Sequence, residues 1–187
     1  QSSEAVFDDS DGEEDICARI QLIINSSSFR VYTSSDSRGV EVAGASKNVI
    51  ALAAGISDGL GYGDNARAAL VCRGASEITR LGAALSCARE TFAGLSGIGD
   101  LVATCTSAHS RNHTVGRRIG QGESLEEILA SSDKVAEGVE TTRSLHQLAE
   151  KISVELPITT EVYRVLFEGK APAAAVADLM GRELKRE

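Results

Sequence analysis

Residues 40–54 constrain the fold of this chain more than any other segment. Small and aliphatic residues make up most of it, and Lys47 and Asn48 interrupt them near the middle. On a helix, Lys47 shares its face with the residues three and four positions away, which are Ala43, Gly44, Ile50 and Ala51. That face is apolar and most of its side chains are small, so a second backbone can approach it closely.

Lys47 has two interpretations. An ammonium that is partly removed from water loses some of its preference for the charged form and can serve as a general base. Asn48 beside it offers both a hydrogen-bond donor and an acceptor. In the alternative, Lys47 simply extends from a core helix to water. The local sequence does not decide between the two.

Composition favours a helical protein. The 187 residues can form one domain, or one domain and part of another. Only 4% are aromatic while Ala and Gly are abundant, which suits closely packed helices better than a β-sandwich. The formal net charge of -8 excludes the basic surface typical of nucleic-acid binding. An anionic ligand must therefore be held by local groups.

The cysteines and the hydropathy indicate the cellular compartment in which the protein works. Cys17, Cys72, Cys87 and Cys105 lie far apart and form no Cys-x-x-Cys pair, which is typical of reduced thiols in a cytoplasmic protein. No apolar run is long enough to cross a bilayer, so membrane insertion is not expected. The chain begins with Gln1 and enters structure-like sequence at once. We expect it to be a piece of a longer protein.

Two kinds of pattern divide the chain. Residues 4–7 and 29–33 favour strands, and isoleucines at helical spacing predict a helix over 12–25. This strand-helix-strand order is typical of the end of a parallel α/β layer. From Gly39 onward the pattern predicts helices over 40–60, 64–85, 90–95, 110–120, 137–151, 157–167 and 172–184, with another opened by the capping box of Ser124 and Glu127.

Two motifs favour structural interpretations. Residues 61–66 fit the dinucleotide pattern Gly-x-Gly-x-x-Ala, but no strand of suitable length precedes them. We interpret these glycines as a corner between helices, with Asp64 as the cap of the second. Cys105, His109 and His113 have the spacing of a metal-binding helix face, but no further ligand cluster lies nearby, so a zinc site is disfavoured.

Ser110, Arg111 and Asn112 form a candidate anion site. If Ser110 caps a helix, free backbone N–H groups, the positive helix end and the Arg111 guanidinium converge on one volume suited to a phosphate monoester. The alternative is an arginine on a solvated face. Asp100 follows a glycine-rich turn and can orient a lysine ammonium or a substrate hydroxyl, or cap a helix. Glu137 is equally ambiguous.

Several segments, taken in order, resemble one dehydrogenase family. They are residues 40–51, 58–65, 97–101, 104–106, 110–112, 135–139 and 162–169. Each motif is short, but the ordered set resembles the C-terminal domain of bacterial NAD(P)-dependent glycerol-3-phosphate dehydrogenase. The resemblance runs from about residue 29 to the C-terminus, and residues 1–33 are similar to the end of that family's cofactor domain.

The resemblance implies a mainly α fold. It predicts an all-helical substrate domain of the 6-phosphogluconate dehydrogenase C-terminal-like type over residues 39–187. A short β-α-β remnant of a Rossmann dinucleotide-binding domain would precede it over residues 1–38. The implied reaction interconverts sn-glycerol 3-phosphate and dihydroxyacetone phosphate with NAD or NADP, and supplies glycerol 3-phosphate for glycerophospholipid synthesis in the cytoplasm.

Carried over position by position, the resemblance also assigns roles. Lys47 would be the proton acceptor in glycerol phosphate oxidation and the proton donor in the reverse reaction. The substrate would be surrounded by Lys47, Asn48, Asp100, Thr104, Ser110, Arg111 and Asn112. The cofactor would be contacted by Arg111, Val135 and Glu137. No metal is implied.

One part of the family pattern has no counterpart. The glycine-rich cofactor fingerprint belongs at the start of the cofactor domain, and no segment of this chain corresponds to it. We therefore expect NAD or NADP to be bound mainly by an N-terminal domain outside this chain, and the chain alone to be catalytically inactive. The many Ala and Gly helix faces are compatible with a homodimer.

Two other functions remain open. One is the helical domain of a β-hydroxyacid-type dehydrogenase, which also uses a lysine on a helix, often followed by an asparagine. The other is a non-catalytic helical oligomerisation module. The anion site at residues 110–112, following Asp100, favours the glycerol phosphate enzyme over the first, and the effect of replacing Lys47 separates both enzymes from the second.

Overall fold

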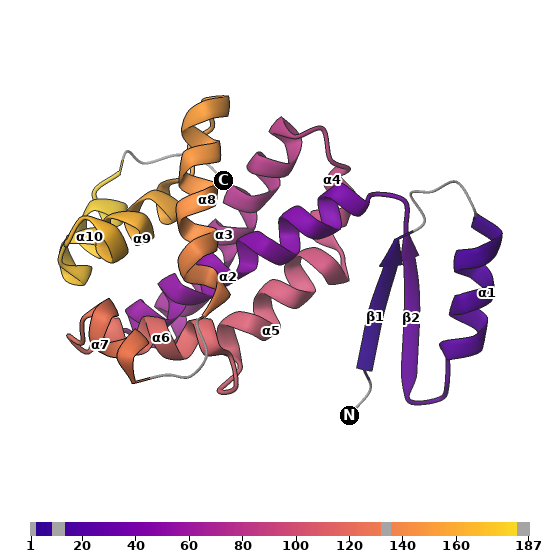
Figure 1. Cartoon of the computed structure of the whole chain (residues 1–187), viewed down its shortest axis with the longest axis horizontal. Coiled ribbons are helices and arrows are strands. Elements are labelled where there is room, and N and C mark those ends of the chain that lie inside the picture. Colours follow the sequence, from indigo (N-terminus) through magenta and orange to yellow (C-terminus); the bar gives the residue numbers. More distant parts are fainter. Residues whose placement is uncertain (1–2, 9–13, 132–135, 183–187) are drawn as a thin grey trace.

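The computed structural model describes residues 3–8, 14–131 and 136–182, and it shows two parts (Figure 1). The smaller part contains strand β1 (Ser3–Asp8), helix α1 (Glu14–Ile24) and strand β2 (Phe29–Ser34). The two strands pair in parallel, with Ser3 opposite Phe29. The predicted strand-helix-strand unit is therefore confirmed, because only a crossover such as α1 can connect two parallel neighbours.

The larger part is helical and is built around α2 (Ser37–Gly59). This helix packs against α3 (Asp64–Ala84), α5 (Asp100–Thr106), α6 (Arg111–Gly120) and α8 (Glu137–Ile152) (Figure 1). Asp36 caps α2 by accepting a hydrogen bond from Gly39 N at 3.0 Å. The same carboxylate accepts hydrogen bonds from Ala88 N at 2.9 Å and Thr91 Oγ1 at 2.7 Å. This cap starts α2 earlier than the predicted position and ties its first turn to α4.

The remaining elements are α4 (Arg89–Ala93), the π-helical turn η1 (Leu95–Gly99), α7 (Leu125–Ala130), α9 (Pro157–Phe167) and α10 (Pro172–Met180). The predicted cap at Ser110 and the capping box of Ser124 and Glu127 are confirmed. Both prolines lie in the first turns of their helices, as predicted. These signals are local, so the sequence shows them directly.

Three expectations about the helices are wrong. Gly63, not Asp64, precedes α3, and Asp64 is its first residue, where its carboxylate pairs with Arg67 at 3.2 Å. The glycine-rich segment after Ala93 is not a flexible turn, because it forms η1 and leads directly into α5. Gly97 is required there by packing, since a Cβ would lie 2.2 Å from the carbonyl oxygen of Phe92. The helix predicted to reach residue 184 ends at Met180.

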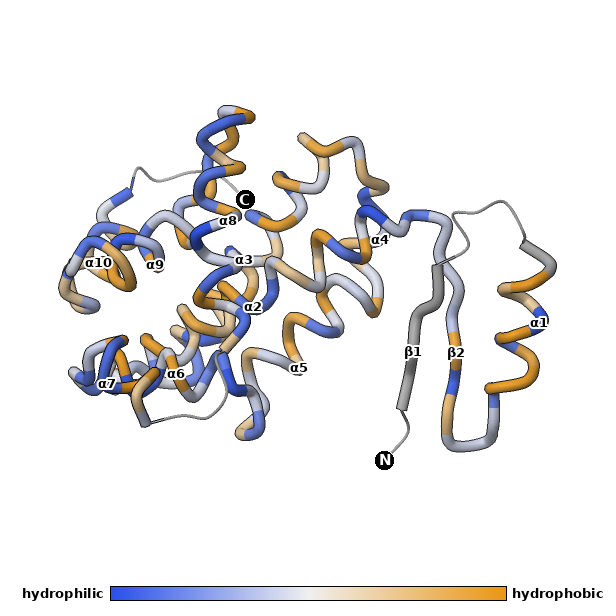
Figure 2. Tube along the Cα trace, in the orientation of Figure 1, coloured by the Kyte–Doolittle hydropathy of each residue, from blue (hydrophilic) through white to orange (hydrophobic). Residues whose placement is uncertain are grey.

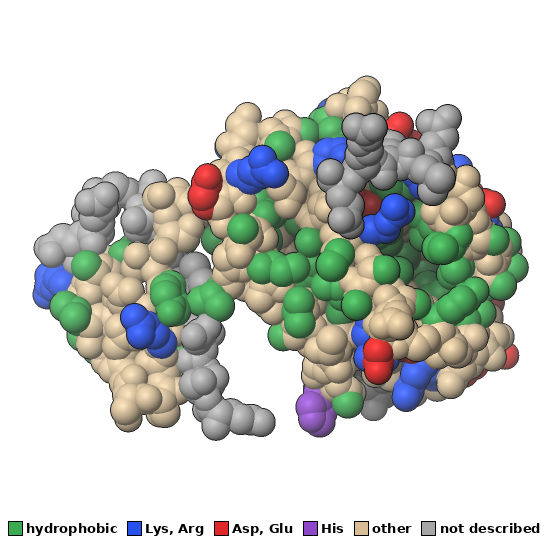
Figure 3. All heavy atoms as spheres, turned by 180° about the vertical axis from the view of Figure 1, so that it is seen from behind, with side chains coloured by type: hydrophobic (Ala, Val, Ile, Leu, Met, Phe, Trp, Pro, Cys, Tyr) green, Lys and Arg blue, Asp and Glu red, His purple; other side chains and the backbone are tan. Residues whose placement is uncertain are grey.

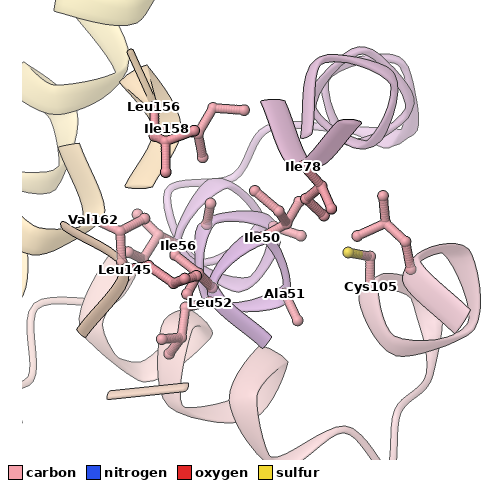
Figure 4. Close-up of a cluster of buried hydrophobic side chains, with 14 of the residues drawn as sticks. Ile50, Ala51, Leu52, Ile56, Ile78, Cys105, Leu145, Leu156, Ile158 and Val162 are labelled. Atoms are coloured by element: carbon pink, nitrogen blue, oxygen red, sulfur yellow. The ribbon is translucent and has the colours of Figure 1, made fainter. Parts of the chain in front are cut away.

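The hydrophobic core surrounds α2 (Figure 4). Leu52 of α2 is fully buried, and Ile78, Leu145 and Val162 reach the same cluster from α3, α8 and α9. Burial of such aliphatic side chains stabilises a fold by roughly 1.5–3 kcal/mol each. Because the cluster also includes Leu101 of α5 and Ile119 of α6, it holds the helices that carry the candidate site in a fixed arrangement.

Hydrophobic residues are distributed differently in the smaller part. Figure 2 shows orange positions along α1, and there Leu22 and Ile23 are 77% and 80% exposed. Seen from the opposite side, hydrophobic side chains gather over the helical part, while the strand-helix-strand unit meets it at one end and is separated from it by a gap at the other (Figure 3).

A close backbone approach joins α2 to α6. A Cβ on Gly55 would lie 2.1 Å from the carbonyl oxygen of His113, and one on Gly116 would lie 2.1 Å from that of Leu52. On the face that contains Lys47, Ala43, Ile50 and Ala51 are buried as well, whereas Gly44 has nothing within 4 Å of its Cβ position. The contact at Gly55 brings the first turn of α6 against α2.

Glu77 joins α3 to α9 inside the core. Its carboxylate is buried and accepts hydrogen bonds from Ile158 N at 2.7 Å, Thr159 N at 2.9 Å and Thr159 Oγ1 at 2.7 Å. These bonds satisfy the free N–H groups at the start of α9, which has no side-chain cap of its own. Burial raises the pKa of Glu77, and the bonds from Thr159 and Ile158 oppose that rise.

Candidate active site

Lys47 lies on α2 and forms an ion pair with Asp100, the first residue of α5. The Lys47 side chain is 23% exposed. The other oxygen of the Asp100 carboxylate accepts a hydrogen bond from Thr104 Oγ1 at 3.2 Å. Lys47 therefore does not simply extend to water. Asp100 holds its ammonium in place, and Thr104 in turn holds Asp100.

Asn48 belongs to a second chain of contacts. Its Oδ1 accepts a hydrogen bond from Asn112 Nδ2 at 2.9 Å, and Asn112 Oδ1 accepts one from Gly138 N at 2.9 Å. Asn112 is buried, so both bonds are shielded from water. A Cβ on Gly138 would lie 2.7 Å from Asn112 Oδ1, which explains the glycine at the start of α8. Asn112 thus joins α2, α6 and α8 through a single amide.

Ser110 and Arg111 lie at the start of α6, the position of the predicted anion site. Ser110 Oγ accepts a hydrogen bond from His113 N at 3.3 Å, which is the predicted cap. The Arg111 side chain is 55% exposed and its Nη2 lies 3.4 Å from Oε1 of Glu137, which is 72% exposed. Such an exposed pair contributes little to stability. The Arg111 guanidinium is therefore available to an anion at the positive end of α6.

The fold brings most of the predicted site residues together. Lys47 and Asn48 are neighbours on α2, and each binds a different helix. Contacts then connect Asp100, Thr104, Asn112, Arg111 and Glu137 to them or to each other. Ser110 belongs to the same helix start as Arg111. Val135 lies outside the residues that the structure describes.

Asp58 of α2, Arg67 of α3 and His113 of α6 meet at the start of α6, an arrangement that the sequence did not predict. Asp58 Oδ2 lies 2.7 Å from His113 Nε2, and the Asp58 carboxylate also binds Arg67 Nη2 at 3.0 Å. His113 therefore does not share a metal site with Cys105, which is buried on α5, or with His109 in the turn before α6. Within the described ranges, no group of three or more His, Cys, Asp or Glu side chains is placed to hold a metal.

The fold is a mainly helical domain that follows a parallel β-α-β unit. The family profile described as NAD-dependent glycerol-3-phosphate dehydrogenase C-terminus matches residues 36–177. The chain belongs to this family, and the resemblance drawn from its motifs is confirmed. Among the helices that the structure describes, none has the length and hydrophobicity needed to cross a bilayer.

Individual relatives agree. The chain is 58% identical to a glycerol-3-phosphate dehydrogenase [NAD(P)+] of Syntrophotalea carbinolica, over 94% of this chain and 53% of the relative. It is 57% identical to the glycerol-3-phosphate dehydrogenase [NAD(P)+] of Geobacillus thermodenitrificans, over 89% of this chain and 48% of that relative. The crystal structure of the Coxiella burnetii glycerol-3-phosphate dehydrogenase superposes with a TM-score of 0.87 at 40% identity, over 97% of this chain and 55% of that one. The chain thus spans about half the length of these relatives.

Proposed function

We propose that this chain is the substrate-binding half of an NAD(P)-dependent dehydrogenase that interconverts sn-glycerol 3-phosphate and dihydroxyacetone phosphate. The observation that carries the proposal is the arrangement of Lys47, held by Asp100, next to an asparagine that binds the start of α6. These contacts support the proposal that Lys47 transfers the proton and that the start of α6 binds an anion. The family and its relatives support it.

In the oxidative direction, Lys47 acts as the general base. Lys47 Nζ takes the proton of the C2 hydroxyl while the hydride leaves C2, so that the O–H and C2–H bonds break and a C2 carbonyl forms. Asp100 keeps Lys47 Nζ oriented toward that hydroxyl, and Thr104 keeps Asp100 oriented. In the reverse direction, the Lys47 ammonium returns the proton to the carbonyl oxygen.

The phosphate is held at the other end of the substrate. Arg111 and the free N–H groups of the first turn of α6 bind its oxygens, because a guanidinium and a helix start both favour a dianion. Asn112 fixes this turn against α2 through Asn48. The substrate is thereby anchored at one end, and C2 is held beside Lys47.

NAD or NADP, when bound, accepts or supplies the hydride at C2. The residues present fit such a group, because Arg111 and Glu137 offer an exposed guanidinium and an exposed carboxylate at the converging starts of α6 and α8. We propose Val135 as a further contact. Residues 1–38 and 39–187 are proposed as the cofactor-domain remnant and the substrate domain.

We also propose a cytoplasmic homodimer. The free thiols of Cys72, Cys87 and Cys105 support a reducing compartment. Light scattering of a purified full-length enzyme tests the dimer.

The decisive experiment uses a full-length enzyme that carries this sequence as its C-terminal half. Oxidation of NADH and NADPH is followed with dihydroxyacetone phosphate, with dihydroxyacetone and with a β-keto acid. We expect turnover with the phosphorylated substrate and little with the other two. Preference for the β-keto acid would favour a β-hydroxyacid dehydrogenase, and no turnover with any of them would favour a non-catalytic helical module.

A further inference from the structure

Asp58 is a carboxylate in an unfavourable electrostatic position. It lies in the last turn of α2, where the negative end of the helix dipole opposes an anion. Its side chain is only 12% exposed. Arg67 of α3 offsets this, because its Nε lies 3.2 and 3.1 Å from the two carboxylate oxygens and its Nη2 lies 3.0 Å from Oδ2. A bidentate pair of this kind fixes the orientation of the carboxylate.

The fixed carboxylate also binds the first turn of α6. His113 Nε2 lies 2.7 Å from Asp58 Oδ2, and the backbone N–H of His113 donates to Ser110 Oγ. His113 therefore connects Asp58 to the residue that caps α6. Arg111 and Asn112 lie between these two points of attachment.

Two adjacent residues thus hold the start of α6 on α2. Asn112 binds Asn48, while His113 binds Asp58. The helices touch between these contacts, where Gly55 leaves no room for a Cβ beside the His113 carbonyl. These two contacts, together with the close packing at Gly55, fix the rotation of α6 about its axis. The direction of Arg111 and of the free N–H groups depends on that rotation.

We propose that Asp58, held by Arg67, is a positioning residue for the anion site at residues 110–112 and acts through His113. The inference rests on the proposed function, because it assigns the phosphate of the substrate to that site. Neither Asp58 nor His113 touches the substrate. Their effect is to orient Arg111 and the first turn of α6 toward the phosphate.

The test compares His113→Leu and His113→Gln in the full-length enzyme. Leucine removes the bond to Asp58, whereas glutamine can still donate an N–H to it. We expect His113→Leu to raise KM for dihydroxyacetone phosphate about tenfold and to leave kcat within about twofold, because uniform binding is lost. The inhibition constant of inorganic phosphate should rise in parallel. In His113→Gln, both KM and this inhibition constant should return most of the way to the values of the unaltered enzyme.

His146→Leu is the matched control. The His146 side chain is 16% exposed, close to the 14% of His113, and its ring stacks on Tyr163 with centroids 4.0 Å apart. We expect this variant to lower the melting temperature without changing KM. An equal rise of KM in His146→Leu, or an unchanged KM in His113→Leu, would overturn the proposal. If His113→Leu does not fold, Asp58→Asn replaces it, with the same expected rise.

The experiments distinguish a failure of the proposed function from a failure of the positioning role. If the unaltered enzyme does not reduce dihydroxyacetone phosphate, the assignment of the substrate is wrong. Calorimetric titration with inorganic phosphate then still measures the anion site. Weaker phosphate binding by His113→Leu than by His146→Leu supports the positioning role, and equal binding overturns it.

Discussion

The ammonium of Lys47 pairs with the carboxylate of Asp100, 53 residues further along the chain. The next residue, Asn48, binds Asn112 of another helix. Two successive residues of α2 therefore fix α5 and α6 relative to each other. We propose that this relationship sets the position of Lys47, as the proton-transfer group, relative to the phosphate site at the start of α6.

Replacing Lys47 tests the proton-transfer role. In the full-length enzyme, we expect Lys47→Ala to lower kcat by about 10²–10⁴-fold, the usual contribution of a general acid or base. The circular dichroism spectrum should not change. Lys151→Ala, at the exposed end of α8, is the control and should keep full activity. Normal turnover in Lys47→Ala would support a non-catalytic module instead.

Replacing Arg111 tests the phosphate site. Hydrogen bonds to charged groups contribute roughly 1.5–3 kcal/mol, so Arg111→Ala should raise KM for the phosphorylated substrate by about 10–100-fold. Arg111→Lys should recover only part of the loss, because an ammonium cannot bind two oxygens in the geometry of a guanidinium. Steady-state kinetics measure both. An unchanged KM in Arg111→Ala would remove Arg111 from the phosphate site.

The 187-residue chain alone should be inactive. The Gly-x-Gly-x-x-Ala match at residues 61–66 joins α2 to α3 rather than a strand to a helix, and the chain spans 53% of the Syntrophotalea carbinolica relative. We expect no NADH oxidation above background with dihydroxyacetone phosphate, while the same assay on a full-length enzyme gives turnover. Measurable reduction by the isolated chain would show that residues 1–187 hold the cofactor without further help.

Ser46 offers a stabilising substitution. Its hydroxyl is buried, with the residue 3% exposed, and makes no hydrogen bond within the described part of the chain. Because a buried unpaired polar group costs roughly 1–3 kcal/mol, Ser46→Ala should raise the free energy of unfolding by about 1 kcal/mol. Urea titration measures this. Thr142→Val is the contrast, since Thr142 Oγ1 donates to Gly138 O at 2.6 Å, and it should give no gain.

Cys105 should make the fold sensitive to alkali. Burial raises the pKa of its thiol from 9.0 to about 12. Between these values the unfolded chain loses the thiol proton while the folded chain keeps it. The contribution of the neutral Cys105 thiol to the free energy of unfolding is therefore fully present below pH 9. It is lost as the pH rises toward 12, by up to about 1.4 kcal/mol per pH unit.

Denaturant titrations between pH 8 and 10.5 test this slope. Cys105→Ala should flatten it, whereas Cys72→Ala should not, because Cys72 is exposed. An identical slope in Cys105→Ala and the unaltered chain would show that other groups cause the alkaline loss.

The sequence by itself determined the local structure and the family. Ser110, Ser124 and the two prolines mark helix starts through contacts within one turn, so they were predictable without knowing the fold. The ordered motifs from residue 40 onward identified the family for the same reason, since each is a short continuous segment. Helix α5 was missed, because seven residues are too few for a periodic pattern to emerge.

Only the tertiary structure decided which side chains meet. The pairs of Lys47 with Asp100 and of Asp58 with His113, and the capping of α9 by Glu77, join residues far apart in the chain. Such contacts depend on how helices cross. On α2 the crossing with α6 is set by Gly55, where the backbones touch. Side-chain spacing along the sequence does not specify which face of a helix will make that contact.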